Sequence, residues 1–228
     1  MTENEFITLL EKQNIILTPK MVEDFRCYFE LLNEYNKVMN LTAIDSKEEV
    51  YDRHFYNSLT IAFNKDFNNL SICDVGAGAG FPSIPLKIVF PNSKITIIDP
   101  LSKRMDFIKE VIKELELKDI NILYLRAEDA SKKYKEVFDI VTARAVAPLN
   151  ILVEITSQLI KINGYLIAMK GQKGNEELQN AKKALETCNL SLENTNCVGK
   201  SINFYFKKTK TIDNKYPRNY GQIKRRPL

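Results

Sequence analysis

The feature that most constrains the fold of this chain is a glycine-rich turn between two apolar runs. The segment from Asp74 to Pro82 reads Asp-Val-Gly-Ala-Gly-Ala-Gly-Phe-Pro. A strand, such a turn and then a helix are typical of α/β folds that bring backbone close to a small ligand, because glycine permits tight turns and carries no Cβ atom. The dinucleotide pattern G-x-G-x-x-G needs a glycine where Phe81 stands, so the spacing here excludes that pattern.

The pattern of apolar and polar residues around the turn predicts a doubly wound, Rossmann-like α/β sheet with helices on both faces. Short apolar runs, typical of buried parallel strands, alternate with amphipathic stretches. The strands are expected at 71–75, 94–99, 120–125, 138–142, 165–169 and 201–207, and the helices at 84–90, 103–117, 149–160 and 176–188, with a turn at Asn163-Gly164.

The chain is divided into three predicted parts. Residues 1–66 are expected to form a helical cap, in which Thr18-Pro19 begins one helix and Asn40 ends it, and in which 46–63 is helical again. Residues 67–208 form the α/β domain. Residues 209–228 form a basic tail, since 207–226 hold eight Lys or Arg and one acidic residue within a chain of net charge +4.

A carboxylate at the end of the second predicted strand, together with the glycine pattern, predicts a cofactor site. Asp99 follows Gly76 by 23 residues, where Rossmann-like folds bind the hydroxyl pair of a ribose. Polar groups after the third strand, at 126–129, lie where they could form hydrogen bonds with the edge of an adenine. Alone, the glycines could form only a tight connection and Asp99 an ordinary turn. Together with Asp74, the pattern resembles the first motif of class I methyltransferases, which implies S-adenosylmethionine as the cofactor.

Absent motifs narrow the methyl acceptor. None of the four cysteines follows a proline, as the nucleophile of pyrimidine C5 methylation would, and Thr142-Ala-Arg144-Ala stands where exocyclic amine methyltransferases carry Asn/Asp-Pro-Pro-aromatic. A purine N7 has a free lone pair, so its methylation needs positioning and no general base. Arg144 at a strand end could read a guanine edge or a phosphate, although a surface ion pair is the alternative.

Further cations are predicted to share one rim of the sheet with Arg144. Lys170 follows the next strand and Lys103-Arg104 begin the helix after Asp99, which suits RNA, although the latter two could merely solvate a helix. His54, the sole histidine, is expected to have a role towards the substrate or in packing.

Eight short motifs in one order resemble the bacterial family of small-subunit ribosomal RNA methyltransferase G, also called glucose-inhibited division protein B. They are Asn40-Leu-Thr42, Arg53 to Leu59, Asp74 to Pro82, Asp99 with Lys103-Arg104, Arg126-Ala-Glu128, Thr142 to Ala145, Lys170-Gly-Gln172 and Lys215 to Arg218. The resemblance spans nearly the whole chain. It departs from the family at Asn57, at Pro100 and near Lys200-Ser201.

The resemblance implies methylation of a guanine N7 in the 530 loop of 16S ribosomal RNA. Together with the motifs above, it assigns three sets of site residues. Arg144 and Lys170 are the catalytic set. The cofactor set is Gly76, Gly78, Gly80, Phe81, Asp99, Ala127, Glu128 and Arg144, and the RNA set is His54, Lys103, Arg104, Arg126 and Arg218.

Two other functions stay open at this point: a nucleotide-dependent Rossmann oxidoreductase, and a non-catalytic RNA-binding module with a methyltransferase-like fold. The cysteines lack metal or disulfide spacing, and no apolar run has the length of a membrane span. The N-terminus is acidic and unlike a secretory signal. We therefore expect a cytoplasmic monomer that needs no metal and acts on 16S ribosomal RNA or the small-subunit particle.

Overall fold

A mixed sheet of seven strands forms the centre of the computed structural model, which describes residues 1–63 and 65–228. The strand order is β3-β2-β1-β4-β5-β7-β6. The first five strands of that order are parallel, whereas β7 runs antiparallel to β5 and to β6. The strands are β1 (Ser71–Val75), β2 (Lys94–Ile98), β3 (Ile120–Leu123), β4 (Phe138–Arg144), β5 (Ile160–Lys170), β6 (Leu190–Val198) and β7 (Ser201–Lys208). The predicted α/β class is confirmed.

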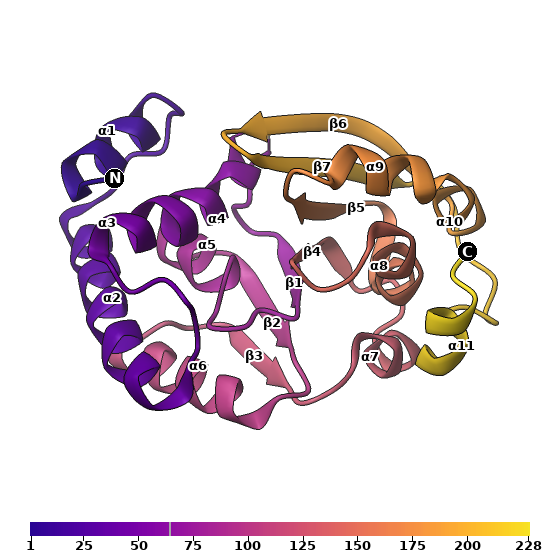
Figure 1. Cartoon of the computed structure of the whole chain (residues 1–228), viewed down its shortest axis with the longest axis horizontal. Coiled ribbons are helices and arrows are strands. Elements are labelled where there is room, and N and C mark those ends of the chain that lie inside the picture. Colours follow the sequence, from indigo (N-terminus) through magenta and orange to yellow (C-terminus); the bar gives the residue numbers. More distant parts are fainter. Residues whose placement is uncertain (64) are drawn as a thin grey trace.

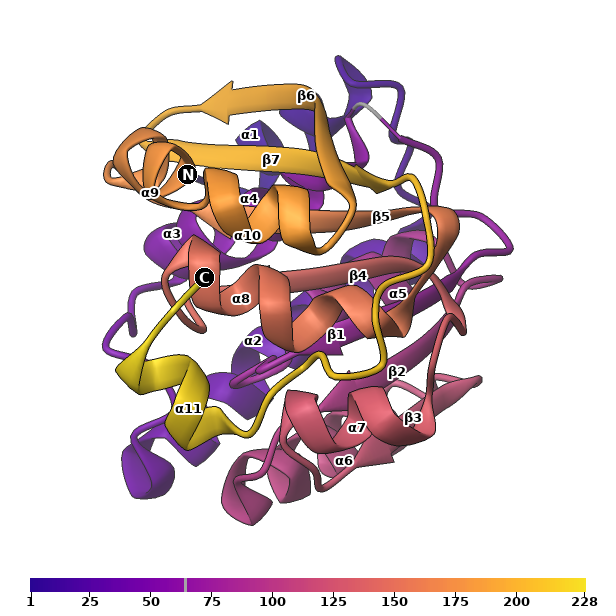
Figure 2. The same ribbon diagram turned by 90° about the vertical axis from the view of Figure 1, so that its right-hand side faces the viewer.

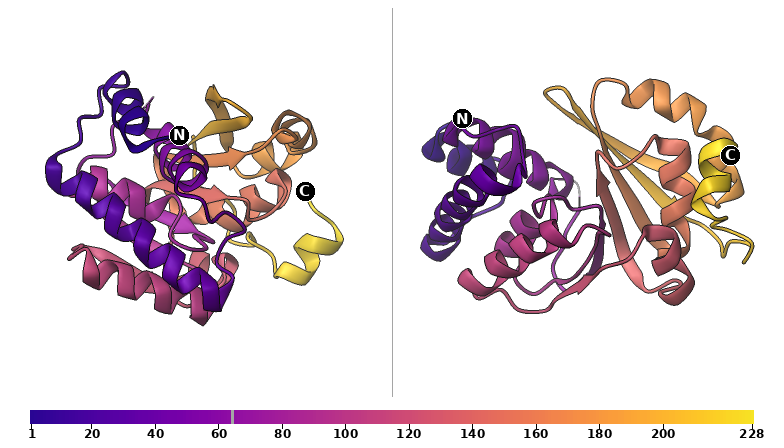
Figure 3. Two further views of the ribbon diagram at one scale, coloured as in Figure 1. Left: turned by 60° about the vertical axis from the view of Figure 1, so that its left-hand side comes forward. Right: turned by 60° about the horizontal axis from the view of Figure 1, so that its bottom comes forward.

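In β1, β2, β4, β5 and β7, the buried apolar residues are divided between two hydrophobic clusters, one on each face of the sheet. In β1, Ile72 belongs to the first cluster and Cys73 to the second, and both side chains are fully buried. Helices cover both faces, which explains why the parallel strands are apolar throughout. Figure 3 shows the sheet edge-on between the two helical layers.

The N-terminal helices lie on the first face and share its cluster, together with α5 (Ser83–Val89) and α6 (Ser102–Glu114). The long α2 (Pro19–Met39) contacts both α5 and α6 (Figure 1). As predicted, Thr18 caps α2, accepting from the Met21 amide, and Asn40 ends it; Asn40 adopts the left-handed conformation. The other elements are α1 (Glu3–Glu11), α3 (Lys47–Val50), the π-helix η1 (Tyr51–Tyr56), α4 (Asn57–Leu59) and the 3-10 helix η2 (Thr60–Ala62).

The second face carries the remaining helices and the C-terminal tail, which follows β7 and passes over α8 (Figure 2). The elements are α7 (Ala127–Lys133), α8 (Leu149–Thr156), the 3-10 helix η3 (Ser157–Leu159), α9 (Gly174–Asn180), α10 (Lys182–Thr187) and α11 (Tyr220–Arg225). Two tail residues, Ile212 and Ile223, are buried in the second cluster. The basic tail is thus packed against the domain.

Five features differ from the sequence-based expectations. Asn163-Gly164 lies inside β5, where the pairing with β4 shifts register and Asn163 adopts a φ of 66°. The predicted helix at 176–188 is divided into α9 and α10. The strand β6 and the helices α7 and α11 were not predicted. Each carries several exposed polar residues, so none shows the apolar pattern of a buried element.

Candidate cofactor and substrate site

The candidate site lies where the parallel sheet changes winding direction. β1 is flanked by β2 on one side and by β4 on the other, and the chain returns to β4 only after β3. In open α/β sheets, ligands bind at the carboxyl ends of the strands at such a switch point. The glycine turn, Asp99 and Arg144 follow or end β1, β2 and β4, so the topology brings the three predicted features to one edge.

The three glycines of the turn all have positive φ, but they serve different purposes. A Cβ atom at Gly76 would come within 2.7 Å of Val146, and one at Gly80 within 2.7 Å of Ile84 and 2.9 Å of the Tyr28 hydroxyl. These two positions are needed for close packing. Apart from its own chain neighbours, Gly78, with a φ of 61°, has no atom of residues 1–63 or 65–228 within 4 Å of the place a Cβ would take. Gly78 therefore leaves open space through which a ligand can approach the backbone.

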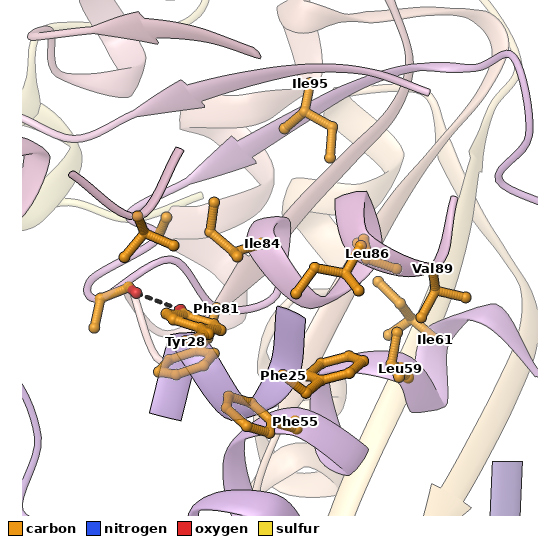
Figure 4. Packing of buried hydrophobic residues seen from close by; sticks show 14 of the residues in the cluster. Phe25, Tyr28, Phe55, Leu59, Ile61, Phe81, Ile84, Leu86, Val89 and Ile95 are labelled. Carbon is orange, nitrogen blue, oxygen red and sulfur yellow. Dashed lines mark hydrogen bonds between the residues drawn. The ribbon is translucent and has the colours of Figure 1, made fainter. Parts of the chain in front are cut away.

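The side chain of Phe81 packs in the core between the glycine turn and α2. Its ring is 3% exposed and lies against Tyr28, with 5.4 Å between ring centroids (Figure 4). The Tyr28 hydroxyl donates to the Ala79 carbonyl at 2.5 Å and so ties α2 to the glycine turn. The ring of Phe81 is thus part of the core, and only the backbone of this predicted cofactor residue remains for a ligand.

Asp74 is a buried carboxylate at the start of the turn. Its Oδ2 accepts from the Ser83 amide at 3.1 Å, whereas its buried Oδ1 has no hydrogen-bond partner in the described part of the chain. Burial raises the pKa of Asp74 to about 6, and the bonds from Ser83 oppose that shift. An unsatisfied buried acceptor of this kind is costly unless a ligand donor reaches it.

Two further carboxylates line the neighbouring strand ends. Asp99 is 2% exposed, accepts from the Leu101 amide through Oδ1 at 2.9 Å, and meets Arg104 at 3.8 Å through Oδ2. Glu128 is also buried, next to the buried Ala127 in the first turn of α7. The open space at Gly78, the unpaired Oδ1 of Asp74 and the oxygens of Asp99 fit a ligand with an ammonium group and a ribose, as S-adenosylmethionine has.

Arg144 is held at the end of β4 by uncharged groups. Its Nη1 donates to the Arg53 carbonyl at 3.3 Å and to Asn57 Oδ1 at 3.5 Å, and its Nη2 lies 3.3 Å from His54 Nδ1. The guanidinium also lies over the Phe81 ring, 5.0 Å from the centroid. Burial lowers the pKa of Arg144 to about 10, partly offset by the charge of Asp74. No salt bridge neutralises Arg144 within residues 1–63 and 65–228.

Lys170 lies near Arg144 but has its own partners. Its Nζ donates to the Ala147 carbonyl at 2.6 Å and forms a 2.8 Å salt bridge with Glu177, which also accepts from the Leu149 amide. A cavity of about 400 Å³ joins this lysine to Arg144. The contacts show that Lys170 fixes the loop after β4, and its predicted catalytic role stays a prediction.

The predicted RNA residues fall into separate environments. Lys103, Arg104 and Arg126 are exposed, and Arg126 lies over the ring of Tyr220 at 5.6 Å. His54 is half-buried beside Arg144. Arg218 differs, because its side chain forms two bonds to the fully buried carboxylate of Glu154 on α8, at 2.8 and 2.6 Å. That partner accounts for Arg218 without RNA.

Comparison with known proteins agrees with this geometry. A family model described as GidB, rRNA small subunit methyltransferase G, matches residues 21–205. The chain belongs to this family. Proteins named ribosomal RNA small subunit methyltransferase G from Bacillus cytotoxicus and Bacillus thuringiensis are 47% and 46% identical to it, and each alignment covers 100% of this chain and 99% of the relative.

Solved structures show the same fold at low sequence identity. A SAM-dependent methyltransferase from Aquifex aeolicus superposes with a TM-score of 0.59 at 17% identity, covering 75% of this chain and 97% of the other. TYW2 from M. jannaschii, in complex with AdoMet, has a TM-score of 0.57 at 16% identity and covers 73% and 79%.

Family membership confirms two predictions, the kind of enzyme and its cofactor. The protein is an S-adenosylmethionine-dependent methyltransferase of ribosomal RNA. The alternatives of an oxidoreductase and of a non-catalytic module are not supported. None of the described helices is both long enough and apolar enough to span a membrane.

Proposed function

We propose that this methyltransferase acts on N7 of a guanine in the 530 loop of 16S ribosomal RNA, in the cytoplasm and as a monomer without a metal. The observation that carries the proposal is the state of Arg144. Three of its five N–H groups have protein acceptors, which leaves Nε–H and one hydrogen of Nη2 without a partner in the described chain. These two donors form one side of the guanidinium and can bind an oxygen such as guanine O6.

The chemistry of a purine N7 agrees with such a site. Its lone pair attacks the methyl carbon directly, so the enzyme needs to hold base and cofactor in line but need not remove a proton. His54, the nearest candidate base, has its Nδ1 turned to Arg144 and its Nε2 at 2.8 Å from Thr42 Oγ1. Both ring nitrogens are therefore occupied, which suits an acceptor that requires no deprotonation.

The cofactor, when bound, supplies an electrophilic methyl group. Around it, Asp74 offers its unpaired Oδ1 to a donor, Asp99 offers oxygens to the ribose hydroxyls, and the backbone at Gly78 allows close approach. Ala127 and Glu128 begin α7 beside these groups. We assign Gly76 and Gly80 to shaping the turn, since a Cβ at either would collide with protein atoms.

The RNA backbone is proposed to cross the exposed cations at the rim of the sheet. Lys103, Arg104 and Arg126 are exposed, and the contact of Arg126 with Tyr220 places α11 beside Arg126. Arg225 and Arg226 line a hollow of about 400 Å³ at α11. Exposed arginines of this kind attract phosphates and make affinity fall steeply with salt.

The first experiment is methyl transfer from labelled S-adenosylmethionine to 16S RNA, free and in small-subunit particles. Mass mapping should place the product on a guanine N7 in the 530 loop, and the same position should be unmodified in a deletion strain. A modification that persists in that strain would refute the assignment.

Asp99→Ala tests the cofactor site separately. Loss of charge-assisted hydrogen bonds to the ribose should weaken S-adenosylhomocysteine binding by about tenfold or more, as measured by calorimetry. Asp106→Ala is the matched control, because Asp106 is an exposed carboxylate on the adjacent helix α6. Equal affinities in the two variants would argue against the assignment of Asp99.

A further inference from the structure

The π-helix η1 and the residue that follows it, Asn57, present three hydrogen-bond acceptors to one guanidinium. Residues at positions i, i+1 and i+4 of this segment contribute the Arg53 carbonyl, His54 Nδ1 and Asn57 Oδ1 to Arg144, which is 87 to 91 residues away in sequence. The amide of Asn57 bonds to the Asp52 carbonyl, five residues earlier, which is the wide turn that defines this helix type. π-Helical turns are rare and are frequently found at functional sites.

The protonation state of His54 follows from its neighbours. A guanidinium can only donate, so Nδ1 must be the acceptor from Arg144, and the ring proton resides on Nε2. Nε2–H then donates to Thr42 Oγ1 at 2.8 Å, and that oxygen also accepts from the Ile44 amide at 3.1 Å. The result is a chain of bonds from Arg144 through His54 to Thr42.

The ring of His54 is also fixed on its face. It stacks on Phe81 with 4.5 Å between centroids and an interplanar angle of 17°. The groups packed around the ring are Thr42 after α2, Phe81 in the glycine turn, Arg144 on β4 and Arg53, which precedes His54 in the chain. The charged groups among these are both cations. Burial, followed by the charge of Arg144, lowers the pKa of His54 to about 4, which keeps the imidazole neutral at physiological pH.

We propose that His54 is a positioning residue whose neutral Nδ1 orients the guanidinium of Arg144, so that its free edge faces the methyl acceptor. This role rests on the proposed function of Arg144, and it differs from the direct RNA contact expected from the sequence. Asn57 strengthens the arrangement, because its Nδ2 donates to Ser201 Oγ at 2.8 Å while its Oδ1 accepts from Arg144. The site is thus anchored to α2, η1 and β7.

Two variants separate the hydrogen bond from simple packing. His54→Phe keeps a ring on Phe81 but has no acceptor, whereas His54→Asn loses the ring but can place an acceptor oxygen near the position of Nδ1. If His54 positions Arg144, kcat for methyl transfer falls about 10- to 100-fold in His54→Phe, as expected for a hydrogen bond to a charged group, and stays within about threefold in His54→Asn. The KM for S-adenosylmethionine should change less than kcat in both. The reverse ranking, or no effect in either variant, overturns the proposal.

A double-mutant cycle with Arg144→Lys decides the case in which both variants lose activity. If His54 positions Arg144, His54→Phe should lower kcat by less than about twofold in the Arg144→Lys background, since there is no guanidinium left to orient. Additive losses overturn the proposal. Thermal unfolding of each variant identifies a loss that is due to folding.

A spectroscopic readout keeps this test independent of the RNA reaction. Slowly exchanging guanidinium protons of Arg144, assigned by their absence in Arg144→Lys, should persist in His54→Asn and disappear in His54→Phe. If the wild-type protein shows these signals but transfers no methyl group to RNA, the proposed function fails while the positioning contact stands. If the signals are equal in both variants, the positioning role fails by itself.

Discussion

Arg218→Ala should strongly destabilise the fold, because it leaves a buried carboxylate without its cation. Glu154 is fully buried on α8, and Arg218 gives it two side-chain bonds and one backbone bond of 2.8, 2.6 and 3.0 Å. Removing one partner of a buried pair costs about 3–5 kcal/mol. Because the backbone bond can persist, we expect the lower end, about 3 kcal/mol. For a chain of this size that corresponds to a fall of about 6–12 °C in Tm.

Urea unfolding and calorimetry of the RNA-free protein measure this loss. Arg225→Ala is the matched control, since Arg225 is an exposed arginine of the same tail and should change stability by less than about 0.5 kcal/mol. Adding Glu154→Gln to Arg218→Ala should restore part of the stability, because the amide carries no buried charge. A loss below about 1 kcal/mol in Arg218→Ala, or no recovery in the double variant, would refute the reasoning.

Two other stability predictions follow from the site. Gly80→Ala should lower the free energy of unfolding by about 3 kcal/mol, since its Cβ would lie 2.7 Å from Ile84 at a φ of 99°. Gly78→Ala should lower it by only about 1 kcal/mol, because the space beside Gly78 is open. Equal losses in urea titrations would contradict this contrast. His54 has a pKa of about 4 in the folded state and about 6.5 when unfolded, so stability is retained above pH 6.5 and about 3 kcal/mol is lost as the pH falls to 4. The difference between the unfolding free energies of wild type and His54→Asn should show this slope, and parallel pH curves would count against it.

Local sequence signals predicted much of the fold. Thr18-Pro19 and Asn40 give the two ends of α2, because a cap and a left-handed residue act within one turn. The apolar runs give β1, β2 and β4, because both faces of these strands are buried. By contrast, β6 has mostly exposed side chains, so its sequence lacks the pattern of a buried strand.

The donor side of the site could also be predicted, since Asp74, the glycines and Asp99 follow consecutive strands of one supersecondary unit. The partners of Arg144 could not be predicted, because they come from the π-helix η1 and from Asn57 after it, which reach Arg144 only through tertiary packing. The RNA contact of Arg218, suggested by the basic tail and the family resemblance, stays a prediction. Its ion pair with Glu154 was not foreseen, and the sequence signal for it was this isolated acid in the apolar helix Leu-Asn-Ile-Leu-Val-Glu-Ile-Thr, 64 residues earlier.

The packing of the tail sets the order in which this protein can be completed during synthesis. The first face of the sheet and the N-terminal helices form a cluster whose last member along the chain is Tyr205, so that side can assemble before the tail is synthesised. The second cluster needs Ile212 and Ile223, and α8 keeps an uncompensated acid until Arg218 has left the ribosome. A nascent chain that stalls within its last two dozen residues would therefore expose an apolar helix face with a charge at its centre, a natural target for chaperones and proteases.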